Sequence, residues 1–542
     1  MKFLTPALAA ATLCIVSCVG VDYNLGGNIV PIDQTYTIYS EEEPLSEMMM
    51  DFTDSLSGYS QTRITIGAIR DEHFGLTTRG SVVTLVPMYD TLEFGSNPIV
   101  KRFHFAAGAD TVCCLYDSQR YSLQNVRVYP LDKKMSEKEY DINTPVTHGS
   151  GIISKGIPML NGKDSLSFDF TDSYASKYLD ITQEDLDDLD KYLEKFPGIY
   201  LETDAPSGLG GRINCFNLQL GFDSSYYTLT GNYASLTIET KYDDWDERGD
   251  TTFYFYYSPI DDYDIDSLFT NSSTGSFPQY CRNVAGHQTR DKVGAADELV
   301  LIEGGGGLKP RIPAKSLKEI AERIISSQGA DPQNVVINKA TLVLPFEFPE
   351  DYTEMDLFPY KLSPTCRIKT DTSATFASLT DSSNENENQG DIDRSNLQFA
   401  PDITYHIQEL LKIKETDTEK YKRIENGSYD IWLLIMANEV VTSSSSSSSS
   451  SDLSEYYQYL AYQSYYNSMY GGYGSYGYSG YGSSYSNYYT YMMMAQMYSS
   501  SSSTESTSEE LDKDRYYYGY LNGPGATGRV PKLKLTFSVP NE

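Results

Sequence analysis

The sequence predicts a mainly β protein made of two tandem antiparallel β-sandwiches of the jelly-roll-like type, with a few short helices and one long disordered loop. Three observations predict this fold class. Short runs of β-branched and aromatic residues are separated by Gly, Pro, Asn and Asp, few segments have helical spacing, and the two halves show a similar order of elements. Such runs, joined by loops, are typical of antiparallel sandwiches. A length of 542 residues allows two or three domains.

The N-terminal residues have the pattern of a bacterial lipoprotein signal. Lys2 precedes a short apolar run, and a lipobox follows, Ile15-Val16-Ser17-Cys18. We expect residues 1–17 to be a signal peptide that is cleaved before Cys18, whose thiol is then acylated. Residues 18–60 would be the lipidated cysteine and a polar, irregular tether. Acyl chains would then be the only membrane attachment, because the apolar run is shorter than the ~20 residues that span a bilayer.

The first sandwich is expected at residues 61–258. It begins with short strand-like runs such as 63–66 and 81–86, and it contains one helix. Thr182 can cap this helix, which carries apolar residues at three- and four-residue spacings as far as Phe196. Residues 259–296 are predicted to be a linker.

The second sandwich is expected at residues 297–542. A helix starts near Ser316, and a weaker one covers residues 403–411. Both halves have strands, a helical piece, a buried strand and a closing strand in the same order, which predicts two copies of one sandwich. Coincidence between two unrelated all-β domains is the alternative. Residues 442–508, rich in Tyr, Ser and Gly, are expected to be a disordered insertion between two strands.

The charge balance excludes one class of function. The chain has 42 basic and 75 acidic side chains, a formal net charge of −33. A nucleic-acid binder needs basic side chains to neutralise phosphates, so no nucleic-acid partner is expected. Apart from Cys14 and Cys18, the five cysteines form an odd, scattered set, which does not predict a disulfide framework. We expect Cys113, Cys114 and Cys215 to be small core side chains; one isolated disulfide bridge is the alternative.

Several short motifs, taken in order, resemble a known family. They follow the lipobox and are residues 24–31, 66–75, 195–201, 301–307, 336–342 and 531–537. This order is similar to that of the domain-of-unknown-function 4270 family, lipoproteins of the Bacteroidetes outer membrane. The resemblance spans nearly the whole mature chain, but the Tyr/Ser-rich insertion departs from it. It implies a location and no established activity. The order of elements also resembles that of DNRLRE-type jelly rolls, found as adhesive or carbohydrate-binding modules, which concerns the fold alone.

Known catalytic motifs are missing. The five histidines are far apart in sequence, with no zinc spacing, and the globular segments hold no Gly-x-Ser-x-Gly elbow. We expect the histidines to be structural or surface residues. Four glycines before Lys309 suggest a phosphate loop, but Pro310 stands where that motif needs Ser or Thr, so we expect a flexible turn.

Two groups of side chains are candidates for binding. Asp262, Asp264 and Asp266 match the opening of a calcium loop, although solvated loop acids are the simpler interpretation. Trp245, Tyr254 and Tyr256 could stack on sugar rings, although their alternation also fits a half-buried strand. Sites of the type that Bacteroidetes O-glycosylate, Asp followed by Ser or Thr and then by an apolar residue or Thr, occur at Ser55, Thr91, Thr111, Ser165, Thr251 and Ser267.

These features predict an outer-membrane-anchored lipoprotein that binds an envelope protein or a glycan, or has a structural role, without being an enzyme and without a cofactor. The alternative is a surface enzyme that degrades polysaccharides with two carboxylates about 5–9 Å apart, a separation that no sequence shows. The residues after Cys18 lack the acidic run that resembles a Bacteroidetes surface-export signal. We therefore expect the periplasmic face of the outer membrane. The oligomeric state is not predicted.

Overall fold

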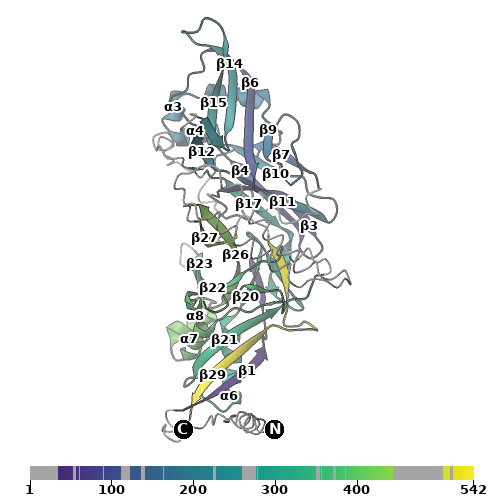
Figure 1. The fold of residues 1–542 in the computed structure, drawn as a ribbon, viewed down its shortest axis with the longest axis vertical. Helices are drawn as coiled ribbons and strands as arrows, with labels where there is room; N and C mark the ends of the chain where they lie inside the picture. The colour runs from purple at the N-terminus through teal and green to yellow at the C-terminus, as the bar shows by residue number, and fades with distance from the viewer. Residues whose placement is uncertain are drawn as a thin grey trace, which may run out of the picture.

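The computed structural model describes most of residues 35–541. The residues outside the description are 1–34, 53–55, 60, 90, 111–121, 136–140, 163, 224–227, 259–275, 278, 350–354, 356, 370–373, 385, 443–504, 513–516 and 542. The described chain is mainly β, with antiparallel sheets and short helices, which confirms the predicted fold class. Figure 1 shows an elongated molecule, with β14 and β15 at its upper end and β1 and β29 at its lower end.

The upper part, which we call the first body, is organised around one large sheet. Twelve strands form it: β3 (Arg63–Asp71), β4 (Gly75–Val83), β5 (Leu85–Pro87), β6 (Ser96–Ala109), β7 (Gln124–Pro130), β8 (Met159–Leu160), β9 (Leu166–Asp169), β10 (Ile199–Thr203), β11 (Gly210–Asn217), β14 (Ala234–Lys241), β15 (Gly249–Tyr257) and β17 (Arg282–His287). A smaller sheet contains β12 (Leu220–Asp223), β13 (Thr228–Gly231) and β16 (Ser276–Phe277). Its helical segments are α2 (Asp172–Ala175), η5 (Ser176–Asp180), α3 (Gln183–Leu186), α4 (Leu189–Lys195) and η6 (Gln288–Lys292).

The lower part, the second body, has three sheets. The five-stranded sheet holds β1 (Tyr36–Pro44), β29 (Lys532–Pro540), β21 (Val336–Pro345), β25 (Gln398–Phe399) and β24 (Ile392–Asp393). The seven-stranded sheet holds β18 (Gly294–Ala295), β2 (Met49–Phe52), β20 (Leu308–Ile312), β26 (Ile431–Thr442), β22 (Leu362–Lys369), β23 (Ala374–Ser378) and β27 (Glu505–Leu511). The two-stranded sheet pairs β19 (Leu299–Glu303) with β28 (Tyr518–Asn522). Its helices are α6 (Ala314–Ser327), η8 (Thr380–Ser383), α7 (Thr404–Lys412) and α8 (Thr418–Glu425).

The predicted tether at 18–60 is wrong for most of its described residues. β1 pairs with β29 from Tyr36↔Pro540 to Pro44↔Lys532, and β2 pairs with β20. The second body is therefore built from both ends of the chain, with the first body inserted between β2 and β18. The sequence pattern missed β1 because it is an edge strand, mostly exposed and rich in acids, whose partner lies almost 500 residues away.

The predicted linker at 259–296 is also wrong where the structure describes it. β17 pairs with β4 of the first body, and β18 pairs with β2 of the second. A chain segment that supplies strands to both bodies joins them more firmly than a linker would.

Strand pairing repeats between the two bodies. In the first body, β6 pairs with β9 and β14, while β10 pairs with β4 and β7. In the second body, β21 pairs with β25 and β29, while β26 pairs with β20 and β22. In both, helices lie between the fourth and fifth of these strands in sequence, β9 and β10 in the first body and β25 and β26 in the second. This shared topology supports two copies of one sandwich over a coincidental similarity.

The predicted disordered insertion, 442–508, lies outside the described residues between 443 and 504. At its ends, β26 and β27 pair from Met436↔Leu511 to Thr442↔Glu505, so residues 505–508 belong to a strand. The two segments that flank residues 443–504 are therefore paired strands of the second body, as expected for an insertion between strands.

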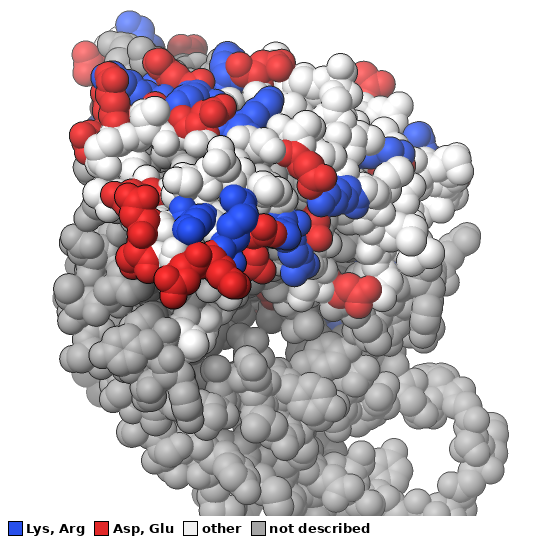
Figure 2. Space-filling view, turned by 90° about the horizontal axis from the view of Figure 1, so that it is seen from above, with Lys and Arg blue, Asp and Glu red and all other residues white. Residues whose placement is uncertain are grey.

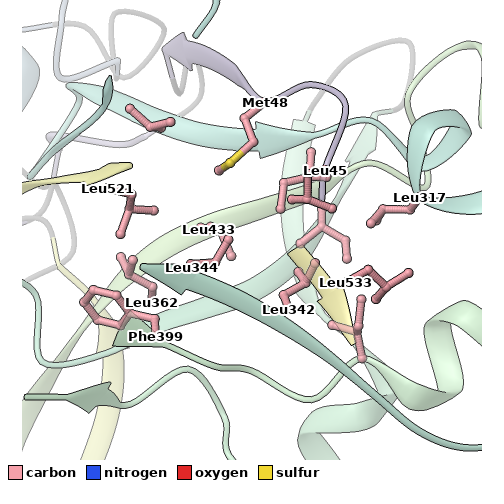
Figure 3. Packing of buried hydrophobic residues seen from close by; sticks show 14 of the residues in the cluster. Leu45, Met48, Leu317, Leu342, Leu344, Leu362, Phe399, Leu433, Leu521 and Leu533 are labelled. Atoms are coloured by element: carbon pink, nitrogen blue, oxygen red, sulfur yellow. The ribbon is translucent and has the colours of Figure 1, made fainter. Parts of the chain in front are cut away.

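Each body has its own hydrophobic core. Cys215 is buried in the first body, as predicted for a small core side chain, while Cys113 and Cys114 lie outside the described residues. Cys281 is also buried there, and Cys366 is half-buried. In the second, Figure 3 shows Leu45, from the N-terminal segment, close to Leu533 of β29 and Leu342 of β21. The helix predicted at 182–196 is two helices, because Asp188 caps a second one immediately after the first.

A truncation tests whether residues 36–44 are a strand or a tether. A chain that starts at Leu45 loses β1, which leaves the edge of β29 unpaired and removes the contact between Tyr39 and Phe537. We expect its second body to unfold at a lower temperature in calorimetry and to aggregate more readily, because an unpaired edge recruits other strands. The control chain starts at Thr35 and keeps β1. Equal unfolding temperatures for the two chains would show that residues 36–44 are a tether.

Candidate functional site

The outer face of β15, β14, β6 and β9 collects side chains that could bind a ligand. Side chains alternate between the two faces of a strand, so Phe253, Phe103 and their alternate neighbours fill the core. The intervening residues point outwards. Tyr254 pairs with Ser235, Ser235 with His104, and His104 with Asp169, which makes one row across the four strands. We call this surface the tyrosine–histidine face: Arg102, His104, Ser167, Asp169, Tyr233, Ser235 and Tyr254.

Two tyrosines form its aromatic part. The rings of Tyr233 and Tyr254 meet edge to face, with their centroids 5.4 Å apart and an interplanar angle of 87°. Both are half-buried, so part of each ring is exposed to a ligand. Burial and the neighbouring Tyr254 raise the pKa of Tyr233, which keeps this hydroxyl neutral and able to donate a hydrogen bond.

The polar part is a connected set of hydrogen bonds. His104 Nδ1 lies 2.7 Å from Asp169 Oδ1, and His104 Nε2 lies 3.2 Å from Ser167 Oγ. Arg102 Nε donates to Asp169 Oδ1 over 2.8 Å. Burial alone would raise the pKa of Asp169, but the hydrogen bonds from His104 and Arg102 outweigh it and lower that pKa. Asp169 is therefore a carboxylate held in one orientation.

The structure separates the three aromatic candidates. Tyr254 lies on the tyrosine–histidine face, whereas Tyr256 is 6% exposed and belongs to the core, as expected for a half-buried strand. Trp245 lies in the turn before β15, where its ring meets Tyr242 edge to face at 5.0 Å. Five residues of extended chain separate Gly249 from Tyr254, roughly 17 Å. The predicted platform is therefore reduced to Tyr254, and its aromatic neighbour is Tyr233.

The other predicted sites fall in different places. Cys18, Asp262, Asp264, Asp266, Ser55, Thr111 and Ser267 lie outside the described residues. Thr91 and Ser165 are exposed, while Thr251 is half-buried and paired with Ile238. Within the described ranges, no group of three or more His, Cys, Asp or Glu side chains could hold a metal ion.

The best-placed acid near this face, Glu239, does not have the properties of a catalytic acid. Arg248 Nε donates to Glu239 Oε1 over 3.0 Å, and Lys101 forms an ion pair with Oε2. The hydrogen bonds from Lys101 and then Arg248 lower the pKa of Glu239, whereas a glycosidase acid needs a raised pKa. Figure 2 shows the same mixing of charges over the end of the molecule seen from above, where acidic and basic side chains are interspersed.

A second cluster is buried where the two bodies meet. The carboxylate of Glu303, fully buried on β19, accepts hydrogen bonds from Thr77 (2.8 Å) and Thr289 (2.7 Å), and Nδ1 of His287 lies 2.9 Å away. Burial alone would raise the pKa of Glu303, but His287 and the two hydroxyls stabilise the carboxylate and lower the pKa to about 2. Burial lowers the pKa of His287.

The expected flexible turn at 304–307 is instead a packed part of this cluster. Lys309 Nζ donates to the carbonyls of Glu303, Gly305 (3.0 Å) and Gly307 (3.1 Å), and burial lowers its pKa to about 7. A Cβ at Gly305, where φ is +59°, would lie 2.4 Å from Arg79 Nη2. Glycine is needed here for close packing and not for flexibility.

No family model, curated protein or solved structure matches this chain. The resemblance to the domain-of-unknown-function 4270 family therefore stays a prediction. Among the described helices, none has both the length and the apolar character needed to cross a membrane.

The Glu303 carboxylate predicts a loss of stability in acid. In the unfolded chain, Glu303 has its ordinary pKa of about 4.5 and is protonated below that pH. In the folded chain, it is protonated only near pH 2. Stability from this group is present above about pH 4.5 and is lost as the pH falls to about 2, a change of about 3 kcal/mol. We expect Glu303→Gln to lower the unfolding temperature at pH 7 and to flatten its decline between pH 4.5 and 2. The exposed Glu298→Gln is the control. Unchanged acid dependence in Glu303→Gln would contradict this account.

Proposed function

We propose that this protein is a lipoprotein, anchored to the outer membrane through Cys18, that binds a glycan of the cell envelope on the tyrosine–histidine face. The observation that carries the proposal is the row from Tyr254 to Asp169, which places partly exposed rings beside fixed hydrogen-bonding groups on one flat sheet surface. The binding role needs neither a metal ion nor a cofactor.

The chemistry of the face suits a sugar. The C–H faces of a pyranose ring pack on exposed aromatic surface, and Tyr233 and Tyr254 offer such surface with a polar end. Sugar hydroxyls bond well to charged groups, which Asp169 and Arg102 supply. Because the chain has a formal net charge of −33, we propose a neutral glycan, which avoids long-range repulsion.

The position of the face suits an anchored receptor. β14 and β15 lie at one end of the long axis and β1 at the other (Figure 1). Cys18 precedes Thr35 by 17 residues, so the acyl anchor would lie within about 60 Å of β1, at the end remote from the binding face. We propose that the body projects from the inner leaflet into the periplasm.

Substitution of Tyr254 tests the binding face. In calorimetric titrations with neutral envelope oligosaccharides, we expect Tyr254→Ala to weaken binding about tenfold, because a ring contact is removed. Tyr254→Phe should keep most of the affinity. The control is Tyr405→Ala, which removes an exposed tyrosine of the second body. Undiminished affinity in Tyr254→Ala, or no binding by the wild-type chain, would overturn the proposal.

Two cysteine variants test the anchor. In a bacterium that processes lipoproteins, we expect Cys18→Ala to abolish incorporation of labelled palmitate and to move the protein from the membrane to the soluble fraction, because the acylated thiol is lost. Cys14→Ala is the matched control and should be acylated normally. If Cys14→Ala lost the label and Cys18→Ala kept it, the acylated residue would be Cys14, and the proposed anchor at Cys18 would be wrong. Protease added to intact cells should leave the protein whole if it faces the periplasm.

A further inference from the structure

Three side chains of the tyrosine–histidine face have the connections of a nucleophilic relay. Ser167 Oγ lies 3.2 Å from His104 Nε2, and His104 Nδ1 lies 2.7 Å from Asp169 Oδ1. These are the atoms, in the order, through which a serine hydroxyl passes its proton to an imidazole oriented by a carboxylate. His104 and Asp169 are half-buried, whereas Ser167 is exposed to a substrate.

The backbone explains why the three side chains meet. Phe170 N–H donates to the carbonyl of Phe103, so in the antiparallel pair of β6 and β9 every second residue pair is hydrogen-bonded. His104↔Asp169 and Ala106↔Ser167 are the intervening pairs, whose side chains approach most closely. The small side chain of Ala106 leaves the space above it open, so Ser167 reaches His104 diagonally.

Nδ1 of His104 has two polar partners. Asp169 Oδ1, at 2.7 Å, only accepts hydrogen bonds, whereas Arg102 Nη2, at 2.9 Å, only donates them. The relay uses the tautomer with the proton on Nδ1, which the shorter contact with the carboxylate favours. Nε2 then carries a lone pair towards the hydroxyl of Ser167. Arg102, which donates to Asp169 and whose Nη2 lies 2.9 Å from Nδ1, fixes the carboxylate on the side away from Ser167.

One backbone donor is placed to stabilise a negatively charged oxygen. Ser167 and Ala106 form a non-hydrogen-bonded pair, so the backbone N–H and C=O groups of Ser167 point away from β6. Asp169 belongs to the next such pair, and its carbonyl accepts a hydrogen bond from Lys155 N–H on that outer side. In the described part of the chain, no strand pairs with β9 along this edge at Ser167. The nucleophile's own N–H can therefore donate to the oxyanion of an attacked ester.

We propose that Ser167 is a nucleophile, activated by His104 and Asp169, that removes ester-linked acyl groups from a glycan held on the tyrosine–histidine face. Ser167 Oγ bonds to the acyl carbon while Nε2 takes its proton, and that proton then passes to the departing sugar oxygen as the C–O bond breaks. Water hydrolyses the acyl-serine by the same route, releasing a carboxylic acid and restoring Ser167. The glycan part of this inference rests on the proposed function.

The substrate class follows from the distance to the aromatic rings. Tyr254 and β9, the strand of Ser167, are three strand spacings apart, about 14 Å. A sugar packed on Tyr254 would therefore place an acylated sugar further along the same chain over Ser167. The open sheet surface admits a polymer along its length, which an enclosed pocket would not.

An alkyl fluorophosphonate tests the nucleophile directly. Reaction with Ser167 forms an O–P bond and releases fluoride, and peptide mass spectrometry locates the adduct. We expect labelling of the mature chain at Ser167, its loss in Ser167→Ala, and a rate lower by about 100-fold in His104→Gln and Asp169→Asn, because the general base and its orienting group are removed. Acetate release from acetylated oligosaccharides should fall in parallel in the same three variants.

Matched controls separate this inference from the binding role. Ser165→Ala removes an exposed serine two residues away, outside this face, and should keep the wild-type rate. Tyr254→Ala should react with the fluorophosphonate normally but release acetate from the oligosaccharide more slowly. Labelling of Ser167 without any sugar binding would overturn the glycan role alone. Equal labelling rates in the wild type and His104→Gln, or acetate release unchanged in Ser167→Ala, would overturn the nucleophile.

Discussion

The buried carboxylate of Glu303 is the interaction on which the arrangement of the two bodies depends. Thr77 and Arg79 come from β4, His287 ends β17, and Glu303 ends β19 of the second body. A charge removed from water costs several kcal/mol unless its partners satisfy it, so these strands must meet in one geometry. Apolar residues of the first body, Ile69, Phe74 and Ile213, extend the second core to the same junction. The tyrosine–histidine face is therefore held at a fixed position relative to the end of the molecule that contains β1.

In the sheet that carries the tyrosine–histidine face, the same strands both fill the core and present polar side chains to the solvent. The same strands that bury Phe103 and Phe105 present His104 outwards, because side chains alternate along a strand. The dense aromatic core beneath, where Phe103 contacts Phe170 and Phe255, fixes the backbone that carries the polar row. A rigid support of this kind is what a hydrogen-bonded relay needs to keep its distances.

How far the sequence predicts this molecule depends on how local each signal is. The β-rich runs, the helix at Thr404–Lys412 and the repeated order of elements come from local patterns, and the structure confirms them. β1 is missed because its partner is distant and its face is polar. The face was only partly foreseen: Tyr254 was a candidate, but His104 lies 63 residues before Ser167 and 65 before Asp169, so no motif spacing joins them. The one available signal was that His104 and Asp169 each lie beside buried apolar residues in strand-like runs, which predicts that their side chains are on the outer face of the sheet.

The placement of β1 has a mechanical consequence. If the chain is anchored at Cys18, as proposed, the anchor lies upstream of β1, and the same chain continues through β2 into the body that carries the proposed glycan site. A load between polymer and membrane would then act along the axis of β1 and slide it against β29. All nine register pairs of that ladder resist such sliding together, whereas peeling would break them one at a time. The pairing of β1 with β29 would thus be loaded in shear. The resistance of the second body to pulling on its N-terminal strand would then depend on a strand from the C-terminal part of the same polypeptide.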